Sequence, residues 1–236
     1  MKFVTSVATA VALALGGAAQ AADVMLLTED YAPMNFERGG EIVGLGADQV
    51  FEMMNRAGIT YEAELTQWSR AIGQAERRPN TCVFSTTHTE ERDPNFQWVE
   101  PLASDSTILV RKAGSDIAPA SIDDARGYRT GTQTGDYTVG VLEEAGFEAI
   151  DLAPSQSATL KKLLQGRIDL MATSGSFLEA ALADGAEIEE ALVISTTTMS
   201  VACSHKTDQA LVARMQEALQ SMIDDGTQAE IMAKYE

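Results

Sequence analysis

The sequence predicts an α/β fold in which helices cover a mainly parallel β-sheet. Between residues 24 and 85, short apolar runs alternate with segments of helical periodicity in the order strand, helix, strand, helix, strand. A second alternating series begins near residue 107 and continues to residue 222. The 236 residues allow one large domain or two lobes of about 100 residues each.

The first series predicts three strands and two helices. The apolar run 24–27 has the composition of a buried strand, and it is followed by the break Tyr31-Ala32-Pro33. Apolar residues recur at helical spacing from Val50 to Ala57 and stop at Gly58, which predicts a helix end there. Further strands are predicted at 61–65 and 82–85, with a short helix at 69–78 between them.

The second series predicts three strands and four helices. Glycine follows the last apolar residue of each helix, as expected where a helix ends in a left-handed residue. The strands are predicted at 107–110, 168–172 and 199–204. The helices contain the apolar segments 139–142, 160–164, 177–183 and 211–222, and end before Gly146, Gly166, Gly185 and Gly226.

The first 21 residues have the features of a secretory signal peptide. Lys2 precedes a mostly apolar run from Val7 to Leu15, and Ala19-Gln20-Ala21 is a small-x-small cleavage site. The run is too short to span a bilayer, and no later segment reaches about 18 consecutive apolar residues. We therefore expect cleavage after Ala21 and a mature chain in the periplasm.

Acidic side chains outnumber basic ones, with 35 Asp and Glu against 17 Lys and Arg and a formal net charge of −18. This charge repels nucleic acid and anionic lipid, so small molecules or proteins are the expected partners. The two histidines, His88 and His205, and the lack of a C-x-x-C pair predict no metal site. Neither Gly44-Leu45-Gly46 nor residues 131–137 have the spacing of a nucleotide-binding motif, so no cofactor is predicted.

The two cysteines, Cys82 and Cys203, lie far apart in the sequence. In an oxidising compartment they either form one disulfide or remain two small buried residues, and both alternatives stay open at this stage. A haem attachment site at Cys203-Ser204-His205 is excluded because the required upstream cysteine is missing.

The segment from Cys82 to Pro101 predicts a strand that leads into a recognition loop. Its apolar start gives way to hydroxyl-bearing residues, among them Thr87, and then to Arg92. Arginine has a fixed fork of donors that can bind a carboxylate in two places, and the hydroxyls add further donors. The alternative is a solvated loop in which Arg92 pairs with a neighbouring acidic residue.

Several short motifs follow one another along the chain. They are Tyr31-x-Pro33-x-x-Phe36, Gly44-x-Gly46-x-Asp48, Thr89-Glu90-Glu91-Arg92 with Phe96 and Pro101, Gly131 to Gly135, and Gly166-Arg167-Ile168-Asp169. In this order, behind a signal peptide, the chain resembles the extracytoplasmic solute-binding proteins of bacterial ABC transporters. The resemblance is to the amino-acid-binding family with the type II periplasmic-binding fold, and it covers essentially the whole mature chain.

The resemblance implies two α/β lobes, each a mainly parallel sheet flanked by helices, with a ligand cleft between them. Lobe one is expected to comprise residues 22–103 and 199–236, and lobe two residues 104–198. The chain would cross between the lobes near 102–106 and 195–199, and these crossings would act as hinges. Both cysteines then fall in lobe one, which makes a disulfide feasible.

In lobe one, the resemblance implies that Arg92 binds the α-carboxylate of a ligand, with Thr87 and the backbone near Ser85 beside it. Tyr31 and Trp68 match two positions whose aromatic rings enclose the ligand. Ordinary packing in the core is the alternative for each ring.

In lobe two, the expected site is a loop that enters a helix. Its residues are Thr132, Gln133, Gly135, Asp136 and Tyr137. A helix start offers free backbone N–H groups and the positive end of the helix dipole, which suit an anion. A simple N-cap by Asp136 would satisfy the same donors, and both can hold at once.

Ser174 stands where amino-acid binders of this family commonly carry an aspartate for the ammonium group of the ligand. A serine hydroxyl cannot offset a buried positive charge. Either another acid such as Asp136 or Glu29 supplies the charge, or the ligand is not a standard α-amino acid. Arg70 is a second cation near the cleft if Trp68 faces it, and an exposed helix residue otherwise. Two arginines without the aspartate would favour a ligand richer in carboxylate.

The expected function is capture of a small polar, carboxylate-bearing ligand, such as an amino acid, by a monomer that presents it to an ABC permease. One alternative is a dehydratase-like periplasmic enzyme on the same scaffold, with Asp136, Glu29 or His88 as acid or base. No paired catalytic motif stands out for such chemistry. A second alternative is a ligand-sensing module that acts on a receptor through the same closed state.

Overall fold

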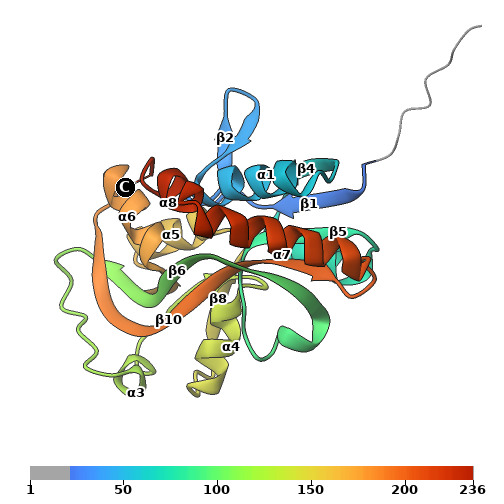
Figure 1. Ribbon diagram of the computed structural model, residues 1–236. Coiled ribbons are helices and arrows are strands. Elements are labelled where there is room, and N and C mark those ends of the chain that lie inside the picture. The colour runs from blue at the N-terminus through green and yellow to red at the C-terminus, as the bar shows by residue number, and fades with distance from the viewer. Residues whose placement is uncertain (1–21, 236) are drawn as a thin grey trace, which may run out of the picture.

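Eight strands form one sheet in the order β4-β1-β5-β10-β6-β9-β7-β8 in the computed structural model, which describes residues 22–235 (Figure 1). The strands are β1 Val24–Thr28, β4 Tyr61–Leu65, β5 Thr81–Thr87, β6 Phe96–Lys112, β7 Thr130–Gln133, β8 Ile150–Ala153, β9 Leu170–Ser174 and β10 Ile188–Ser204. The helices are α1 Leu45–Ala57, α2 Trp68–Arg77, α3 Ile122–Ala125, α4 Tyr137–Glu144, α5 Gln156–Leu164, α6 Gly175–Ala183, α7 Gln209–Asp224 and α8 Thr227–Met232.

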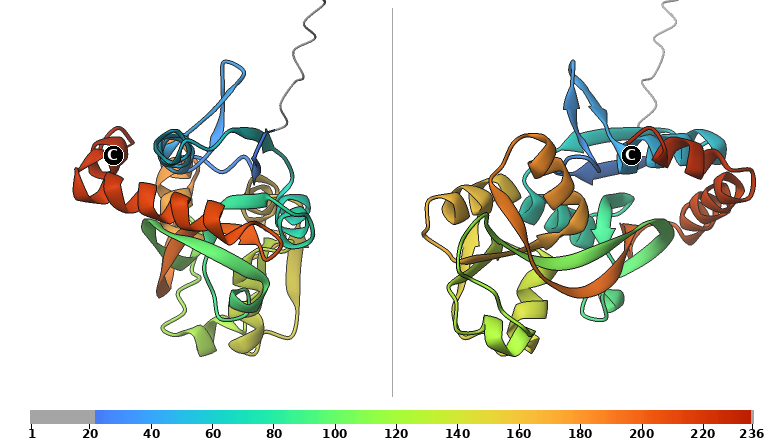
Figure 2. Two further views of the ribbon diagram at one scale, coloured as in Figure 1. Left: turned by 45° about the vertical axis from the view of Figure 1, so that its right-hand side comes forward. Right: turned by 90° about the vertical axis from the view of Figure 1, so that its left-hand side faces the viewer.

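A separate hairpin and a short 3₁₀ turn complete the described elements. The hairpin pairs β2 Phe36–Arg38 with β3 Glu41–Val43 and projects from the body of the molecule (Figures 1 and 2). The 3₁₀ turn η1 spans Asp93–Asn95 and immediately follows Arg92. The predicted signal peptide lies outside the described residues.

The sheet has a parallel group of strands at each end and two long antiparallel strands between them. Strand β1 pairs in parallel with β4 and β5, and β7 pairs in parallel with β8 and β9. The long strands β6 and β10 have 17 residues each and pair with each other along most of their length (Figure 2). The chain therefore has two α/β lobes connected by these two strands.

The two segments in which crossings were expected lie next to each other in this antiparallel pair. Ser106 is opposite Thr196, and Ser104 is opposite Thr198. The register shifts on either side of this stretch, between Val193 and Ser195 and again after Met199. Bulges of this kind locally bend and twist a strand pair, which suits a connection between two lobes.

Helix periodicity predicted the main helices well, and their ends lie within one or two residues of the predicted glycines. Gly58 adopts the left-handed conformation with φ 62° at the end of α1, and its backbone N–H donates to the carbonyl oxygens of Asn55 and Met54 in the last turn. Three strands were predicted too short or displaced: β6 and β10 extend far beyond 107–110 and 199–204, and β9 begins at Leu170 rather than at residue 168.

Several elements have no counterpart in the sequence predictions. Strand β7 consists of Thr130-Gly131-Thr132-Gln133, which has no large apolar side chain, yet all four residues are buried. Strand β8 has two exposed residues in its middle and lies at the edge of the sheet. The hairpin and the short helices α3 and α8 were also missed, because elements of three to six residues carry too few positions to show a period.

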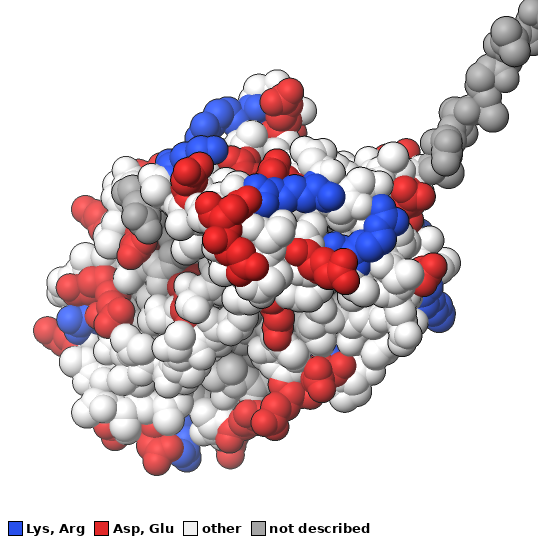
Figure 3. All heavy atoms as spheres, in the orientation of Figure 1, with Lys and Arg blue, Asp and Glu red and all other residues white. Residues whose placement is uncertain are grey.

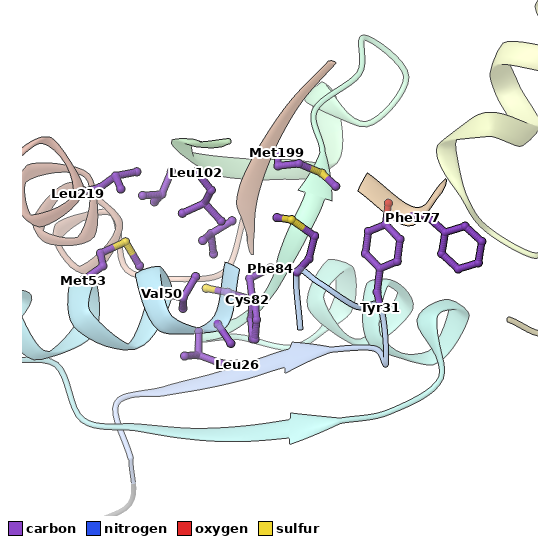
Figure 4. Packing of buried hydrophobic residues seen from close by; sticks show 14 of the residues in the cluster. Leu26, Tyr31, Val50, Met53, Cys82, Phe84, Leu102, Phe177, Met199 and Leu219 are labelled. Atoms are coloured by element: carbon purple, nitrogen blue, oxygen red, sulfur yellow. The ribbon is translucent and has the colours of Figure 1, made fainter. Parts of the chain in front are cut away.

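The core of lobe one lies between the sheet and two long helices. Val50 and Met53 of α1 and Leu219 of α7 are buried and pack toward Leu26 and Phe84 of the sheet (Figure 4). Full burial of an aliphatic or aromatic side chain of this size contributes roughly 1.5–3 kcal/mol to stability. This packing anchors β1 and β5, whose carboxyl ends lead into the candidate site.

A disulfide joins Cys82 of β5 to Cys203 of β10, with the two sulfur atoms 2.07 Å apart. The two residues lie directly opposite each other in adjacent antiparallel strands, and both are completely buried. Of the two alternatives left open by the sequence, the structure has the bonded one.

The surface is predominantly acidic. On the face drawn in Figure 3, Asp and Glu side chains are scattered over most of the surface and outnumber the basic ones. Among the described residues, no helix combines the length and the apolar character needed to cross a membrane.

Candidate functional site

A small cavity lies between the two lobes, where strands of both lobes reach their carboxyl ends. Its volume is about 20 Å³, which is enough for one water molecule but not for an amino acid. The lining residues are Glu29, Tyr31, Trp68, Ser85, Thr87, Arg92, Asp136, Tyr137, Gln156, Thr173, Ser174 and Met199. Ligand sites in open α/β sheets occur at this edge because loops and helix N-termini converge there.

Arg92 lies in the wall of the cavity and is 8% exposed. Strand β5 ends at Thr87, and the loop that follows turns the arginine back over the strand. Its Nη1 donates to the carbonyl oxygen of Thr87 at 3.1 Å, and its Nη2 donates to the carbonyl oxygen of Gly135 in the other lobe at 3.1 Å. The guanidinium carbon lies 5.4 Å from the ring centre of Trp68 and 6.0 Å from that of Tyr137.

The charge on Arg92 is therefore buried but not isolated. Burial lowers the pKa of Arg92, while the carboxyl groups of Asp136 and Glu91 act in the opposite direction. The aromatic rings on either side stabilise a cation through their negative faces. With two bonds to carbonyl oxygens, the five-donor guanidinium retains donors for an anionic group in the cavity.

Gly135 receives two bonds from lobe one at a single carbonyl oxygen. The indole Nε1 of Trp68, the first residue of α2, donates to it at 2.8 Å, in addition to the bond from Arg92. Gly135 has φ 75°, which a residue with a side chain rarely adopts, and a Cβ there would face Ser69 at 3.6 Å. That distance is an ordinary van der Waals contact, so the positive φ rather than a lack of space favours glycine here.

Tyr31 and Ser174 connect the lobes on another side of the cavity. The Tyr31 hydroxyl forms a short hydrogen bond with the Ser174 hydroxyl. Ser174 is the N-cap of α6 and accepts a bond from the backbone N–H of Phe177 at 3.1 Å. The Tyr31 ring stacks on Phe177 with ring centres 6.3 Å apart, and the two rings lie side by side in Figure 4. Burial raises the pKa of Tyr31, so its hydroxyl stays protonated.

Glu29 is a buried acid that follows directly after β1. It is 8% exposed, and its Oε2 accepts a hydrogen bond from Nε2 of Gln133 in the other lobe at 2.5 Å. Burial raises the pKa of Glu29 to about 8, against the opposing effect of the Gln133 bond. The neighbouring carboxyl groups of Asp136 and Asp30 raise this pKa further.

Asp136 caps the N-terminus of α4, as the sequence allowed. Its Oδ1 accepts bonds from the backbone N–H and the hydroxyl of Thr138 at 2.8 and 2.6 Å. Burial raises the pKa of Asp136, and Arg92 acts against that rise. Beside it, the Tyr137 hydroxyl is 2.8 Å from the Thr107 hydroxyl of β6. Burial also raises the pKa of Tyr137.

The structure brings most of the predicted site residues together. Those that line the cavity are Tyr31, Trp68, Ser85, Thr87, Arg92, Asp136, Tyr137 and Ser174. Gln133 and Gly135 do not line the cavity but bond to residues that do. Gln133 donates to Glu29, and the carbonyl oxygen of Gly135 accepts bonds from Trp68 and Arg92. Thr132 is buried within lobe two, where its hydroxyl bonds to Thr138 and to the carbonyl oxygen of Ala172.

Arg70 does not lie at the cavity, and its prediction as a second cation there is corrected. Its side chain is 64% exposed and lies 4.0 Å from Glu64 at the surface. Helix α2 buries Trp68 and Ala71, so a residue two positions after Trp68 faces away from the cleft. Among the residues that line the cavity, Arg92 is the single arginine, so no second cation favours a carboxylate-rich ligand.

The sequence predictions for the site did not include Gln156, Thr173 and Met199, and considered Glu29 only as an alternative acid. The Thr173 hydroxyl donates to Gln156 at 3.1 Å, and the Thr87 hydroxyl lies 3.6 Å from the sulfur of Met199. Thr173 and Glu29 stand at the carboxyl ends of parallel strands, a signal that could have identified them. No local signal marks Gln156 or Met199.

Within residues 22–235, no group of three or more His, Cys, Asp or Glu side chains has the arrangement of a metal site. The cavity combines one buried cation, two acids with raised pKa values, three aromatic rings and several hydroxyls. These side chains are chemically suited to a small polar molecule with a carboxylate at one end and hydrogen-bonding or cationic groups elsewhere, which the cavity can admit once the lobes move apart.

Comparison with known proteins gives one family match. The model of the bacterial extracellular solute-binding proteins, family 3, matches residues 24–236. A search of curated proteins gave no significant match.

Solved structures share the fold at low sequence identity. The arginine-, lysine-, histidine-binding protein ArtJ from Geobacillus stearothermophilus is 20% identical, with a TM-score of 0.82 over 90% of this chain and 94% of its own. An ancestral arginine-binding protein bound to arginine is 21% identical, with a TM-score of 0.80 over 90% and 97%. A histidine kinase sensor domain with similarity to periplasmic binding proteins is 19% identical, with a TM-score of 0.82 over 90% and 95%.

Proposed function

The chain belongs to family 3 of the bacterial extracellular solute-binding proteins, and on this premise we propose that it captures a small, polar, carboxylate-bearing ligand between its two lobes. The observation that carries the proposal is Arg92: a buried guanidinium in the cavity wall, flanked by two aromatic rings and retaining unused donors. A charge-assisted, two-point bond to a carboxylate is strongest in such a water-poor position.

We further propose that the ligand is an amino acid or a close analogue. Glu29 and Asp136 place two carboxyl groups in the same cavity. Burial raises the pKa of both, and a cationic group of the ligand beside them would favour their ionised form and so obtain the negative charge that the Ser174 hydroxyl cannot supply. The names of two structural neighbours, an arginine-, lysine-, histidine-binding protein and an arginine-binding protein, support testing basic amino acids first. With Arg70 outside the site, nothing favours a ligand with several carboxylates.

Binding is proposed to act through hinge closure. Lobe one would comprise residues 22–103 and 199–236 and lobe two residues 104–198, with hinges in the paired stretches of β6 and β10. The bonds from Trp68 and Arg92 to Gly135 join the two lobes, so these bonds must break for the lobes to open. Ligand contacts would then hold the lobes together in place of these bonds. Contacts to both lobes at once then offset the entropy lost on closure.

The closed, ligand-bound monomer is proposed to deliver its ligand to an ABC permease from the periplasm, after cleavage behind Ala21. Sensing is a second candidate, since a histidine kinase sensor domain has the same fold. A pull-down from the native membrane in the presence and absence of ligand separates the two: a permease supports transport, and a kinase or receptor supports sensing.

We propose that the protein binds the ligand without converting it chemically. Glu29 and Asp136 have the raised pKa values that catalytic acids need, and the enzyme alternative would use them. One measurement addresses this alternative. NMR spectra of a ligand kept with the protein for a day should stay unchanged, and appearance of a product would contradict the assignment.

The direct test is a thermal-shift screen of the mature protein against amino acids, dicarboxylates, polyamines and small amides. A ligand at about 100 times its dissociation constant stabilises the folded state by about 2.7 kcal/mol. Carboxylate-bearing compounds, with basic amino acids foremost, should raise the melting temperature. Stabilisation by polyamines alone, with no response to any carboxylate, would sink the proposed role of Arg92.

A further inference from the structure

His88 is a polar residue near the site that the proposed function does not use. It follows Thr87 at the end of β5 and begins the loop that carries Arg92. Its ring stacks on the indole of Trp98, with ring centres 4.0 Å apart and planes inclined by 13°. Its backbone N–H donates to the carbonyl oxygen of Thr198 in β10 at 3.2 Å.

Both nitrogen atoms of the His88 ring face carboxylate oxygens. Nδ1 lies 2.9 Å from Oε2 of Glu100, and Nε2 lies 3.0 Å from Oδ1 of Asp93. A neutral imidazole has one N–H, so between two ionised carboxylates its other nitrogen would turn a lone pair toward an oxygen. Only the positively charged ring, with a proton on each nitrogen, donates to both.

The two carboxylates differ in how firmly they are held. Glu100 is in β6, where its Oε2 accepts a bond from the Ser200 hydroxyl at 2.7 Å and its backbone bonds twice to the side chain of Gln216 in α7. Asp93 directly follows Arg92 in the loop, and its side chain is 63% exposed. His88 therefore ties the loop residue beside Arg92 to a fixed point in the framework.

We propose that His88 is a positioning residue for Arg92: in its charged form it clamps Asp93 to Glu100 and so holds the arginine loop in its binding geometry. The relevance to ligand binding rests on the proposed function, because Arg92 is the proposed carboxylate partner. Of the charged side chains near the ring, Asp93 belongs to η1, Glu100 to β6 and Glu90 to the same loop as His88. On loss of one proton the clamp opens and the loop loosens.

The other histidine provides a matched control. His205 also contacts this loop, with its Nε2 2.7 Å from the carbonyl oxygen of Pro94. That bond needs a single N–H, which the neutral ring supplies. Loss of charge on His205 should therefore leave the loop unchanged, although both histidines touch the same short segment.

The test is an NMR titration of the mature protein labelled with ¹⁵N, in which protons are the only ligand. The His88 ring nitrogens, the Arg92 backbone amide and the Arg92 Nε–H are followed from pH 5 to 8, the range in which histidine side chains change charge. The Arg92 Nε–H peak is assigned by its loss in Arg92→Lys. We expect both Arg92 signals to shift with the same midpoint as the His88 ring.

The shift should be lost in His88→Gln and in Asp93→Asn, and retained with an unchanged midpoint in His205→Gln. Asp93→Asn changes an exposed side chain, so it tests the clamp even if His88→Gln folds poorly. The proposal would be overturned if the Arg92 signals did not change with the His88 titration. It would also be overturned if they shifted in Asp93→Asn by as much as in the wild-type protein. Because no organic ligand is added, this result is independent of whether the protein binds carboxylates.

Discussion

The hydroxyl groups of Tyr31 and Ser174 bond to each other across the cleft, between residues 143 positions apart in the chain. This contact joins the segment after β1 to the N-cap of α6, and so links lobe one to lobe two beside the cavity. It also occupies both hydroxyls, so a ligand that approaches Ser174 competes with Tyr31. The bond therefore ties the two lobes together at the wall of the proposed ligand cavity.

Removing either hydroxyl should weaken the closed arrangement. Tyr31→Phe and Ser174→Ala are each expected to lower stability, and the double variant should show a coupling of about 0.5–1.5 kcal/mol, as for one hydrogen bond. Ser174→Ala also removes a helix cap, which costs about 0.5–2 kcal/mol. The double-mutant cycle separates this cost from the coupling energy of the Tyr31–Ser174 bond. Urea unfolding of the four proteins measures the coupling. Strictly additive losses would show that the bond contributes nothing.

Arg92→Ala should abolish stabilisation by carboxylate ligands, because it removes the buried cation in the cavity wall. The loss is expected to cover the whole ligand-induced stabilisation, about 2.7 kcal/mol at about 100 times the dissociation constant. Arg70→Ala is the matched control, since that side chain is 64% exposed at the surface, and it should bind normally. Calorimetric titration checks both. Equal ligand affinities for the two variants would contradict the proposed role of Arg92 in ligand binding.

Stability should depend on pH through Glu29. Its pKa is about 8 in the folded protein and about 4.5 when solvated, so between these values the folded state holds a proton that the unfolded state has lost. The contribution of Glu29 to stability is therefore complete below pH 4.5 and is lost as pH rises to about 8, by an amount on the order of a few kcal/mol. In Glu29→Gln this fall should disappear.

Melting temperatures of both proteins between pH 4 and 9 test the role of Glu29. The difference between wild type and Glu29→Gln should grow in favour of the variant across that interval. A constant difference would mean that Glu29 does not titrate there. Glu64→Gln, at an exposed position in β4, serves as the control and should keep the wild-type profile.

Replacing Cys82 and Cys203 together by alanine should lower stability by about 3–5 kcal/mol, because the bond closes a loop of 121 residues in the unfolded chain. Chemical unfolding measures the loss. A count of free thiols on the denatured, unreduced protein gives a separate check and should find none. Two reactive thiols would exclude the bond.

Much of the architecture could be predicted from local pattern. The periodic apolar residues of α1 and α7, and the glycines that follow them, placed these helices within a few residues of their ends. Strand β7 could not be predicted, because its four residues Thr130-Gly131-Thr132-Gln133 are buried by neighbours distant in sequence rather than by apolar character of their own. The length of β6 and β10 likewise depends on their pairing with each other.

The candidate site, too, could be predicted only in part from the sequence. Arg92, Trp68 and Tyr31 were predicted from motifs of a family with a fixed order of segments. Arg70 was misplaced because two residues along a helix turn a side chain to another face, and only the packing of α2 shows which face is buried.

By itself, the sequence determined the alternation of strands and helices, the family, and a buried strand that leads into a loop with Arg92. Tertiary structure alone decided that Tyr31 meets Ser174, that Glu29 meets Gln133, and that Trp68 and Arg92 share the carbonyl oxygen of Gly135. Local pattern encodes which side chains avoid water, because periodicity acts within a few residues. Which distant residues become neighbours, and how far burial shifts their pKa, is set by how the two lobes pack against each other.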